Sequence, residues 1–202
     1  VRDPDLSGRR APMEVSIFAG HSRTGPPGAP AFQVQTYYVG KGWRRWPQAM
    51  FALGAILLHP TSRGSVTLAS PDVRTPPVID PQLLSTPEDV AAQIDAYRQI
   101  RRILSAPGLD RWLVEGEHVP GVDDDRLPEA VREYSEADFH PVGTCRMGAD
   151  ESSVVDPRLR VRGVEGLRVV GAAVIPSLPS GNTNAPAMMT GDRLGRFIAA
   201  GD

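Results

Sequence analysis

The stretch "TPEDVAAQIDAYRQIRRIL", residues 86–104, predicts the clearest helix of the chain. Thr86 can cap this helix, Pro87 suits its first turn, and Asp89 follows Thr86 by three residues, as in a capping box. Its apolar residues recur at helical spacing and mark one buried face: Val90, Ile94, Tyr97 and Leu104. Its last turns carry arginines, which suit the negative end of the helix dipole and are expected on a solvated face: Arg98, Arg101 and Arg102.

Two shorter helices are predicted further along the chain. One begins near Pro128 and runs through "EAVREYSEA" to just before His140. The other begins at Ala185–Pro186 and runs through "AMMTGDRLGRFIAA". Each has a proline at its start, where the missing N–H and the fixed φ suit the first turn.

Alternating apolar and polar residues predict strands before the long helix. Two half-buried strands are expected in "EVSIFAG" from Glu14 and "FQVQTYYVG" from Phe32, and two more at residues 51–58 and 65–70. One antiparallel sheet is the simplest arrangement of these four strands. Residues 70–89 carry five prolines in twenty residues, which is expected to prevent regular strand pairing. The fold class that follows is α+β, an antiparallel sheet with helices.

Composition places the chain among ordinary globular proteins. Its 202 residues are 41% hydrophobic and 23% charged, enough for one good-sized core or two small ones. The net charge is −2 and the charges are scattered, so no nucleic-acid partner is expected. The longest apolar run, residues 50–58, is too short to span a bilayer, and no membrane span is expected. Because the chain opens at Val1 with a polar segment, we expect it to be part of a longer protein.

Cysteine and histidine usage limits the possible chemistry. Cys145 is the only cysteine, which excludes an internal disulfide and fits a reducing cytoplasm, where we expect the protein to lie. The histidines are widely spaced, so a zinc site would require long-range convergence: His21, His59, His118 and His140. G-x-G-x-x-G, Walker, G-x-S-x-G and H-E-x-x-H motifs do not occur, which excludes the usual self-contained catalytic modules.

The C-terminal third is rich in small residues, turns and polar groups, a composition that suits backbone packed close to a ligand. In it, "LRVVGAAVIP", residues 167–176, predicts a buried strand that leads into a loop. The polar cluster "SGNTNAP", residues 180–186, then directly precedes a helix. The free N–H groups and partial positive charge at such a helix start can stabilise negative charge on a bound group.

Three motifs in this region occur together: "HPVGTCRMG" at residues 140–148, "DPRLRVRGVEGLRVV" at 156–170 and "PSGNTNAPAMMTGDRLGRFI" at 179–198. In their order and spacing they resemble the glucose-methanol-choline (GMC) oxidoreductases, which bind FAD and oxidise alcohols. The resemblance extends from about Thr61 to Ile198. It implies that residues 1–165 form the substrate-binding domain, and that residues 166–202 are the returning strand and helix of the FAD-binding domain.

The resemblance also implies catalytic roles. His140 matches the histidine that takes the proton of the alcohol, and Asn182 matches the second member of the catalytic pair. A neutral imidazole within hydrogen-bond reach would ease hydride loss by accepting that proton, and a positioned base accelerates a reaction by roughly 10²–10⁴. The Asn182 amide could donate to the developing alkoxide. Alternatively, Asn182 is only a turn residue at the helix entry.

FAD is the cofactor that the resemblance implies. Gly171 and Ala172 match a strand-end position that contacts the FAD linker, although the family commonly has aspartate in place of Gly171. Thr183 and Asn184 match the stretch that lies along the flavin ring. The family's dinucleotide fingerprint is absent, so the FAD-binding N-terminal half is expected to lie outside this chain, which alone should be inactive and bind FAD poorly.

Other interpretations remain open. The chain could be a binding or interaction domain that kept the substrate-domain fold without catalysis. A hydrolase using Ser180 with His140 has no nucleophile elbow to support it, and Cys145 matches a structural turn of the family rather than a nucleophile. An alcohol is the expected substrate, and its pocket could draw on four aromatic residues: Tyr37, Trp43, Trp46 and Phe139.

Overall fold

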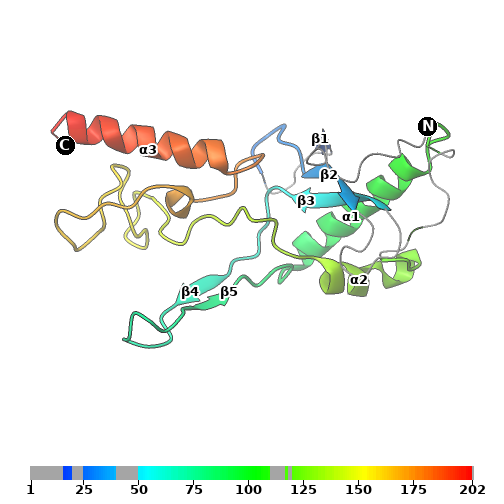
Figure 1. Cartoon of the computed structure of the whole chain (residues 1–202), viewed down its shortest axis with the longest axis horizontal. Coiled ribbons are helices and arrows are strands. Elements are labelled where there is room, and N and C mark those ends of the chain that lie inside the picture. The colour runs from blue at the N-terminus through cyan, green and yellow to red at the C-terminus, as the bar shows by residue number, and fades with distance from the viewer. Residues whose placement is uncertain (1–15, 20–24, 40–49, 110–116, 118–119, 202) are drawn as a thin grey trace.

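The computed structural model describes residues 16–19, 25–39, 50–109, 117 and 120–201. The molecule is elongated, with a three-stranded sheet and the longest helix toward one end and the C-terminal helix at the other (Figure 1). The predicted pocket residues Trp43 and Trp46, and also His21 and His118, lie outside the described residues.

The three-stranded sheet confirms the predicted strands of the first half. β1 (Ser16–Ala19), β2 (Phe32–Val39) and β3 (Met50–Leu57) are antiparallel in the order β1-β2-β3, and Phe32 of β2 faces Leu57 of β3. Residues 32–35 of β2 are all buried, so this part of the strand is covered on both faces rather than half-buried as predicted.

Helix α1 (Pro87–Leu104) confirms the prediction made from its sequence and packs against this sheet. Phe32 and Val34 of β2 form one core with Ala96 and Ile100 of α1. Burying a large apolar side chain of this kind stabilises the fold by about 1.5–3 kcal/mol. The Thr86 hydroxyl accepts a hydrogen bond from Asp89 N at 3.4 Å, which closes the helix start as the capping pattern predicted.

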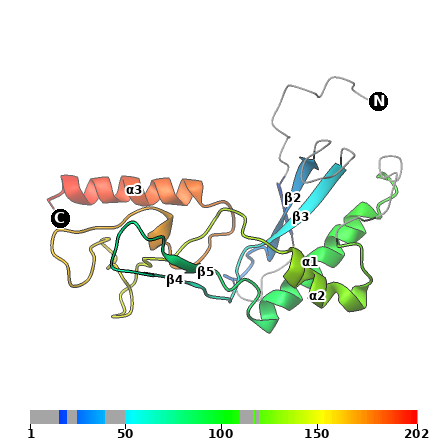
Figure 2. The same ribbon diagram turned by 60° about the horizontal axis from the view of Figure 1, so that its bottom comes forward.

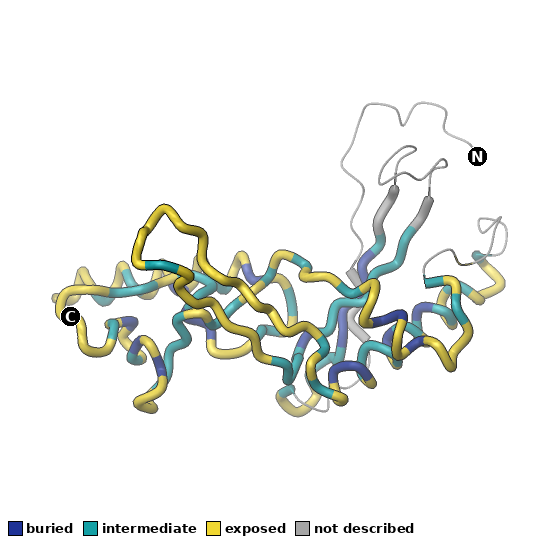
Figure 3. The backbone as a smooth tube through the Cα atoms, turned by 90° about the horizontal axis from the view of Figure 1, so that it is seen from below, coloured by how far each residue is buried: buried dark blue, intermediate teal, exposed yellow. Residues whose placement is uncertain are grey.

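The prediction of a single sheet without pairing in the proline-rich segment is wrong. β4 (Ser65–Thr67) and β5 (Val78–Asp80) form a separate antiparallel ribbon in which Ser65 faces Asp80. The three residues of β5 lie between Pro77 and Pro81, so no proline occupies a paired position. The ribbon lies beside the loops of the C-terminal third in Figures 1 and 2. Figure 3 shows the ribbon as largely exposed.

The second helix is shorter than predicted. α2 (Leu127–Tyr134) follows a single 3₁₀ turn, η2 (Asp124–Arg126), and ends at Tyr134 instead of just before His140. Ser135 takes an extended conformation and Phe139 has a left-handed φ of 57°. Since Pro141 also disfavours helical geometry at His140, the segment before His140 is a loop.

The C-terminal helix α3 (Asn184–Ala199) begins within one residue of its predicted start. The strand predicted in residues 167–176 is wrong, because this segment contains the 3₁₀ turn η3 (Ala172–Val174), and its one β-bridge within the described residues joins Arg168 to Arg160. Gly171 interrupts the extended run with a φ of 100°, which favours glycine.

A second core lies under this C-terminal region. Val155, Leu159 and Val174 are buried together, and partly buried side chains pack around them: Met147, Val161, Val169 and Leu194. This core takes residues from both sides of position 165, where the sequence placed a domain boundary, and that boundary stays a prediction. Within the described residues, no helix has the length and apolar character needed to cross a bilayer.

Candidate functional site

The segment that carries His140 is held against η3 by regularly spaced backbone bonds. The N–H groups of Gly143, Cys145 and Met147 donate to the carbonyl groups of residues 172, 173 and 174 at 3.3, 2.9 and 2.8 Å. Gly143 has a φ of 86°, which permits the turn that follows His140. The backbone of Cys145 therefore takes part in a structural connection.

His140 lies next to the start of α3. Its Nδ1 is 3.1 Å from Oγ1 of Thr183, although the two residues are 43 positions apart. His140 is half-buried and Thr183 is only 6% exposed, whereas Asn182 beside it is exposed. The structure thus brings His140 to the polar cluster before α3, and Thr183 is the residue of that cluster that contacts its ring.

This contact changes what Thr183 can do for a cofactor. Its hydroxyl is engaged with the imidazole and its side chain is buried, while Asn184 is exposed at the first residue of α3. The sequence predicted that the two segments converge, but it carried no signal for a hydrogen bond between these two side chains.

A second histidine reaches the same loop. His59 follows β3, and its Nε2 lies 3.1 Å from Oγ of Ser180. Burial lowers the pKa of the His59 ring, which favours the neutral form. Sequence reasoning missed His59, because one contact between residues 121 positions apart leaves no periodicity to detect. The hydrolase interpretation paired Ser180 with His140, but in the structure the Ser180 hydroxyl contacts His59.

The strand-end position of Gly171 and Ala172 is tied to its surroundings. Gly171 N donates to Thr190 Oγ1 of α3 at 2.9 Å, and its carbonyl accepts from Val174 N at 3.3 Å. Among the described residues, its own chain neighbours aside, no heavy atom lies within 4 Å of where a Cβ on Gly171 would stand. A bound group could therefore approach the backbone closely here, in a space that the aspartate common in the family would enter.

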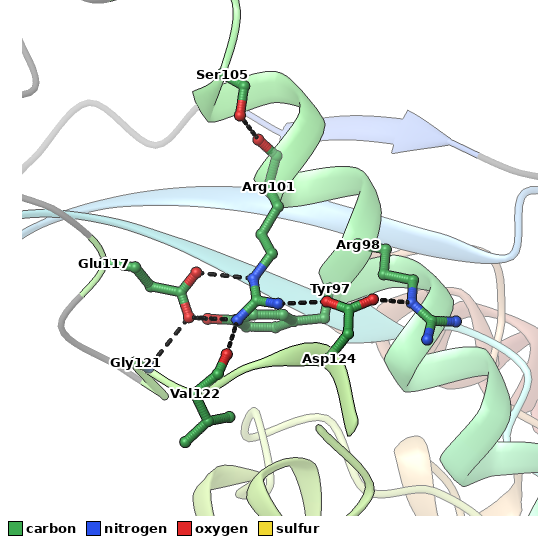
Figure 4. Close-up of polar contacts among 8 residues, drawn as sticks. All are labelled: Tyr97, Arg98, Arg101, Ser105, Glu117, Gly121, Val122 and Asp124. Carbon is green, nitrogen blue, oxygen red and sulfur yellow. Dashed lines mark hydrogen bonds and ion pairs between the residues drawn. The ribbon is translucent and has the colours of Figure 1, made fainter. Parts of the chain in front are cut away.

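Another polar cluster lies near the C-terminal end of α1, the part of the molecule away from α3 (Figures 1 and 4). The Arg101 guanidinium donates to Glu117 Oε2 at 2.8 Å, to Asp124 Oδ1 at 2.6 Å and to the Val122 carbonyl. Arg98 also binds Asp124, at 2.8 Å. Burial raises the pKa of Glu117, but its hydrogen bonds from Arg101, Tyr97 and Gly121 outweigh that and hold it below the ordinary value.

This Arg101 cluster connects Glu117 and residues 121–124 to α1 and is structural. The prediction of a solvated arginine face is wrong for Arg101, whose side chain is only 25% exposed, whereas the Arg98 side chain is 48% exposed. Among the residues that the structure describes, no group of three or more His, Cys, Asp or Glu side chains could hold a metal ion.

The family model of GMC oxidoreductase, for the C-terminal region of these enzymes, matches residues 60–191. The chain belongs to the GMC oxidoreductase family. It is 43% identical over 144 residues to an alcohol dehydrogenase [acceptor] of Pseudomonas putida, covering 70% of this chain and 26% of that protein. It is 40% identical over 155 residues to choline oxidase of Arthrobacter globiformis, covering 73% of this chain and 28% of the oxidase.

Solved GMC structures share the fold. Pyridoxine 4-oxidase from Mesorbium loti superposes with a TM-score of 0.78 at 28% identity, over 90% of this chain and 36% of the oxidase. Formate oxidase of Aspergillus oryzae, studied for its FAD modification, gives a TM-score of 0.77 at 27% identity, over 90% of this chain and 33% of that enzyme. The chain thus spans about a quarter of the length of the curated relatives and about a third of these structures.

Proposed function

We propose that this chain supplies the proton-accepting half of the active site of an FAD-dependent alcohol oxidase or dehydrogenase. The observation that carries the proposal is the contact of His140 with Thr183 at the start of α3, because it joins two of the motifs typical of the family. The substrate is a small alcohol, consistent with the relatives named for alcohol and choline.

The residues of the chain fit FAD as the partner group. The open space beside Gly171 admits close backbone approach, and the exposed Asn182 and Asn184 side chains offer amide donors beside the positive end of α3. Thr183 would contribute through its place in the loop, because its hydroxyl already contacts His140. When bound, FAD accepts the hydride that leaves the alcohol carbon.

The chain's own part in the reaction concerns the proton. His140 Nδ1 is engaged with Thr183, which leaves Nε2 as the nitrogen that can take the proton of the alcohol hydroxyl. The Asn182 amide donates to the alcohol oxygen as negative charge develops on it, and the C–H bond breaks as hydride leaves to form a carbonyl product. His140 then holds the proton as imidazolium.

The rest of the active site would come from an FAD-binding half outside these residues. α3 and the segment from residue 166 would return to that half, as the sequence predicts. The exposed apolar side chains of the β4–β5 ribbon and of the segment that connects its strands suit a surface that this half covers. The most exposed, Leu68 at 87% and Val73 at 97%, lie in that connecting segment.

The test is to join the chain to a GMC FAD-binding half in one polypeptide, load it with FAD and mix it anaerobically with a panel of alcohols. Bleaching of the flavin absorbance by an alcohol, together with carbonyl product, is the expected result. The 202-residue chain alone should bind no stoichiometric FAD. A joined polypeptide that holds FAD normally but is reduced by no alcohol in the panel would favour the binding-domain interpretation.

A further inference from the structure

We propose that Thr183 is a positioning residue that fixes His140 in the tautomer with a proton on Nδ1, so that Nε2 is free to accept the proton of the alcohol. The inference rests on the proposed function for its catalytic meaning. The assignment of the His140 tautomer rests on the contact and the burial of Thr183.

The first observation is how Thr183 is used. It occupies the position directly before α3, where a threonine hydroxyl usually accepts a hydrogen bond from an N–H of the first helical turn. Here the side chain makes no such capping bond, and its Oγ1 lies 3.1 Å from His140 Nδ1. The Thr183 hydroxyl therefore contacts the histidine ring instead of capping the helix.

The second observation is burial. Thr183 is 6% exposed, between two exposed neighbours, Asn182 and Asn184. A buried hydroxyl meets little competition from water, so its contact with the ring persists and restricts rotation of the imidazole. His140 is held from the other direction by the bonds of Gly143 and Cys145 to η3.

A hydroxyl can donate or accept, and the proposed function requires the arrangement in which Nδ1–H of His140 donates to Thr183 Oγ1. A neutral imidazole has one N–H donor and one acceptor nitrogen, and only the acceptor can take a proton. If Nδ1–H donates to Thr183 Oγ1, the lone pair lies on Nε2 before proton transfer, and after transfer both nitrogens carry protons while the Thr183 bond is kept. If the hydroxyl donated to Nδ1 instead, Nε2 would already be protonated and unable to act as the base.

Thr183→Val removes the hydroxyl at nearly constant volume, whereas Thr183→Ser keeps it. Ser180→Ala is the matched control, because it removes the hydroxyl at the other end of the same loop, which contacts His59 and not His140. Since Thr183 makes no capping bond, none is lost in Thr183→Val, and thermal unfolding should show melting temperatures close to those of Thr183→Ser.

The experiment uses the joined FAD-loaded polypeptide labelled with ¹⁵N on histidine, with the His140 signals identified from their loss in His140→Ala. Ring ¹⁵N shifts of the neutral histidine should show Nδ1–H in the parent, in Thr183→Ser and in Ser180→Ala. In Thr183→Val the population should move toward Nε2–H. A parent ring protonated mainly on Nε2, or an unchanged tautomer in Thr183→Val, would overturn the proposal.

Kinetics give the second readout. In Thr183→Val, kcat for alcohol oxidation should fall about 10-fold or more with little change in KM, as when an outer partner that orients a histidine is removed. Thr183→Ser should restore kcat. A shifted tautomer with unchanged kcat would refute the positioning role in catalysis. If instead His140→Ala kept full turnover, the proposed function would fail, while the tautomer measurement would still stand.

Discussion

His59 Nε2 lies 3.1 Å from Ser180 Oγ, and His140 Nδ1 lies 3.1 Å from Thr183 Oγ1 only three residues further along the same loop. Two histidines from separate parts of the chain therefore hold the ends of a four-residue loop. Asn182 lies inside this loop with an exposed side chain. The backbone of Asn182 therefore lies between two residues that each contact a histidine.

His59 should make the stability of the chain depend on pH. Burial lowers its pKa in the folded state, so the unfolded chain binds the proton more readily, and stability is lost as pH falls below the unfolded pKa of about 6.5. Thermal unfolding between neutral and mildly acidic pH should show a smaller fall in melting temperature for His59→Gln than for the parent. Equal slopes for the two proteins would contradict this account of His59.

Asp89 should be among the most sensitive residues of α1. Its buried carboxylate accepts from Thr61 N and Ser62 N at 2.8 Å each and from the Thr61 hydroxyl at 2.9 Å. Burial opposes its ionisation, but the bonds from Ser62 and Thr61 outweigh that and hold its pKa below the ordinary value.

Asp89→Ala would leave these donors without their acceptor and should lower the free energy of unfolding by about 2–4 kcal/mol at neutral pH. Asp95→Asn on the same helix is the control, since Asp95 is exposed, and should cost less than about 0.5 kcal/mol. Denaturant unfolding measures both. The Asp89 effect should shrink as pH falls below about 3.9, where the unfolded carboxyl is protonated. Similar costs for the two variants at neutral pH would refute the anchoring role.

The β4–β5 ribbon should require glycine at position 64, because the backbone of β5 leaves no room there for a Cβ atom. A Cβ at this position would stand 2.2 Å from the Asp80 carbonyl oxygen and 2.7 Å from backbone atoms of Pro81. Gly64→Ala must displace β5, at a cost of about 1–3 kcal/mol. A Cβ at Gly191 in α3 would meet none of the described residues within 4 Å outside the adjacent helix backbone, so Gly191→Ala should stabilise the chain by about 0.5–1 kcal/mol. Chemical denaturation should thus shift in opposite directions for these two alanines, and a stabilising Gly64→Ala would be incompatible with the ribbon as described.

Arg101→Ala should loosen the contact of Glu117 and residues 121–124 with α1 without unfolding the sheet. The Gly121 amide, which donates to Glu117 Oε1 at 3.1 Å, should exchange hydrogen faster when Glu117 loses Arg101. Because the folded pKa of Glu117 is depressed, the protection exists above its unfolded pKa of about 4.3 and is lost as pH falls through the lower folded value. Arg102→Ala, on the exposed side of α1, is the control and should leave Gly121 protected. Unchanged exchange at Gly121 in Arg101→Ala would show that the cluster does not hold this segment.

The helices that the sequence predicted well are those whose starts carry strong local signals. α1 has its cap, its first-turn proline and its terminal arginines within one stretch, and α3 has its polar entry and proline. The end of α2 was missed because the residues after Tyr134 still favour a helix locally. The division into two sheets was missed because strand pairing is set by distant residues, and three paired residues between prolines leave a weak pattern.

The site shows the same limit. Motif resemblance led to the expectation that the His140 segment and the loop before α3 come together, and the contact of His140 with Thr183 connects them. The partners of the two histidines could not be predicted, since each rests on one hydrogen bond across 43 or 121 positions. Nor could the sequence indicate that the N–H of Gly171 donates a hydrogen bond to the Thr190 hydroxyl.

The two residues of the proposed catalytic pair, His140 and Asn182, should differ in how strongly they affect flavin reduction in the joined FAD-loaded polypeptide. His140→Ala should slow flavin reduction by an alcohol by about 10²-fold or more, because proton acceptance is lost while the FAD contacts remain. Asn182→Ala should raise the barrier by less than the roughly 2.7–4 kcal/mol typical of a lost oxyanion donor, since its side chain is exposed and water can partly replace the amide. Rapid-mixing measurements of flavin bleaching give both rates, and the visible spectrum before mixing checks that FAD is bound. Near-full turnover of His140→Ala with a normal flavin spectrum would show that His140 is not the base and serves only in the loop before Pro141.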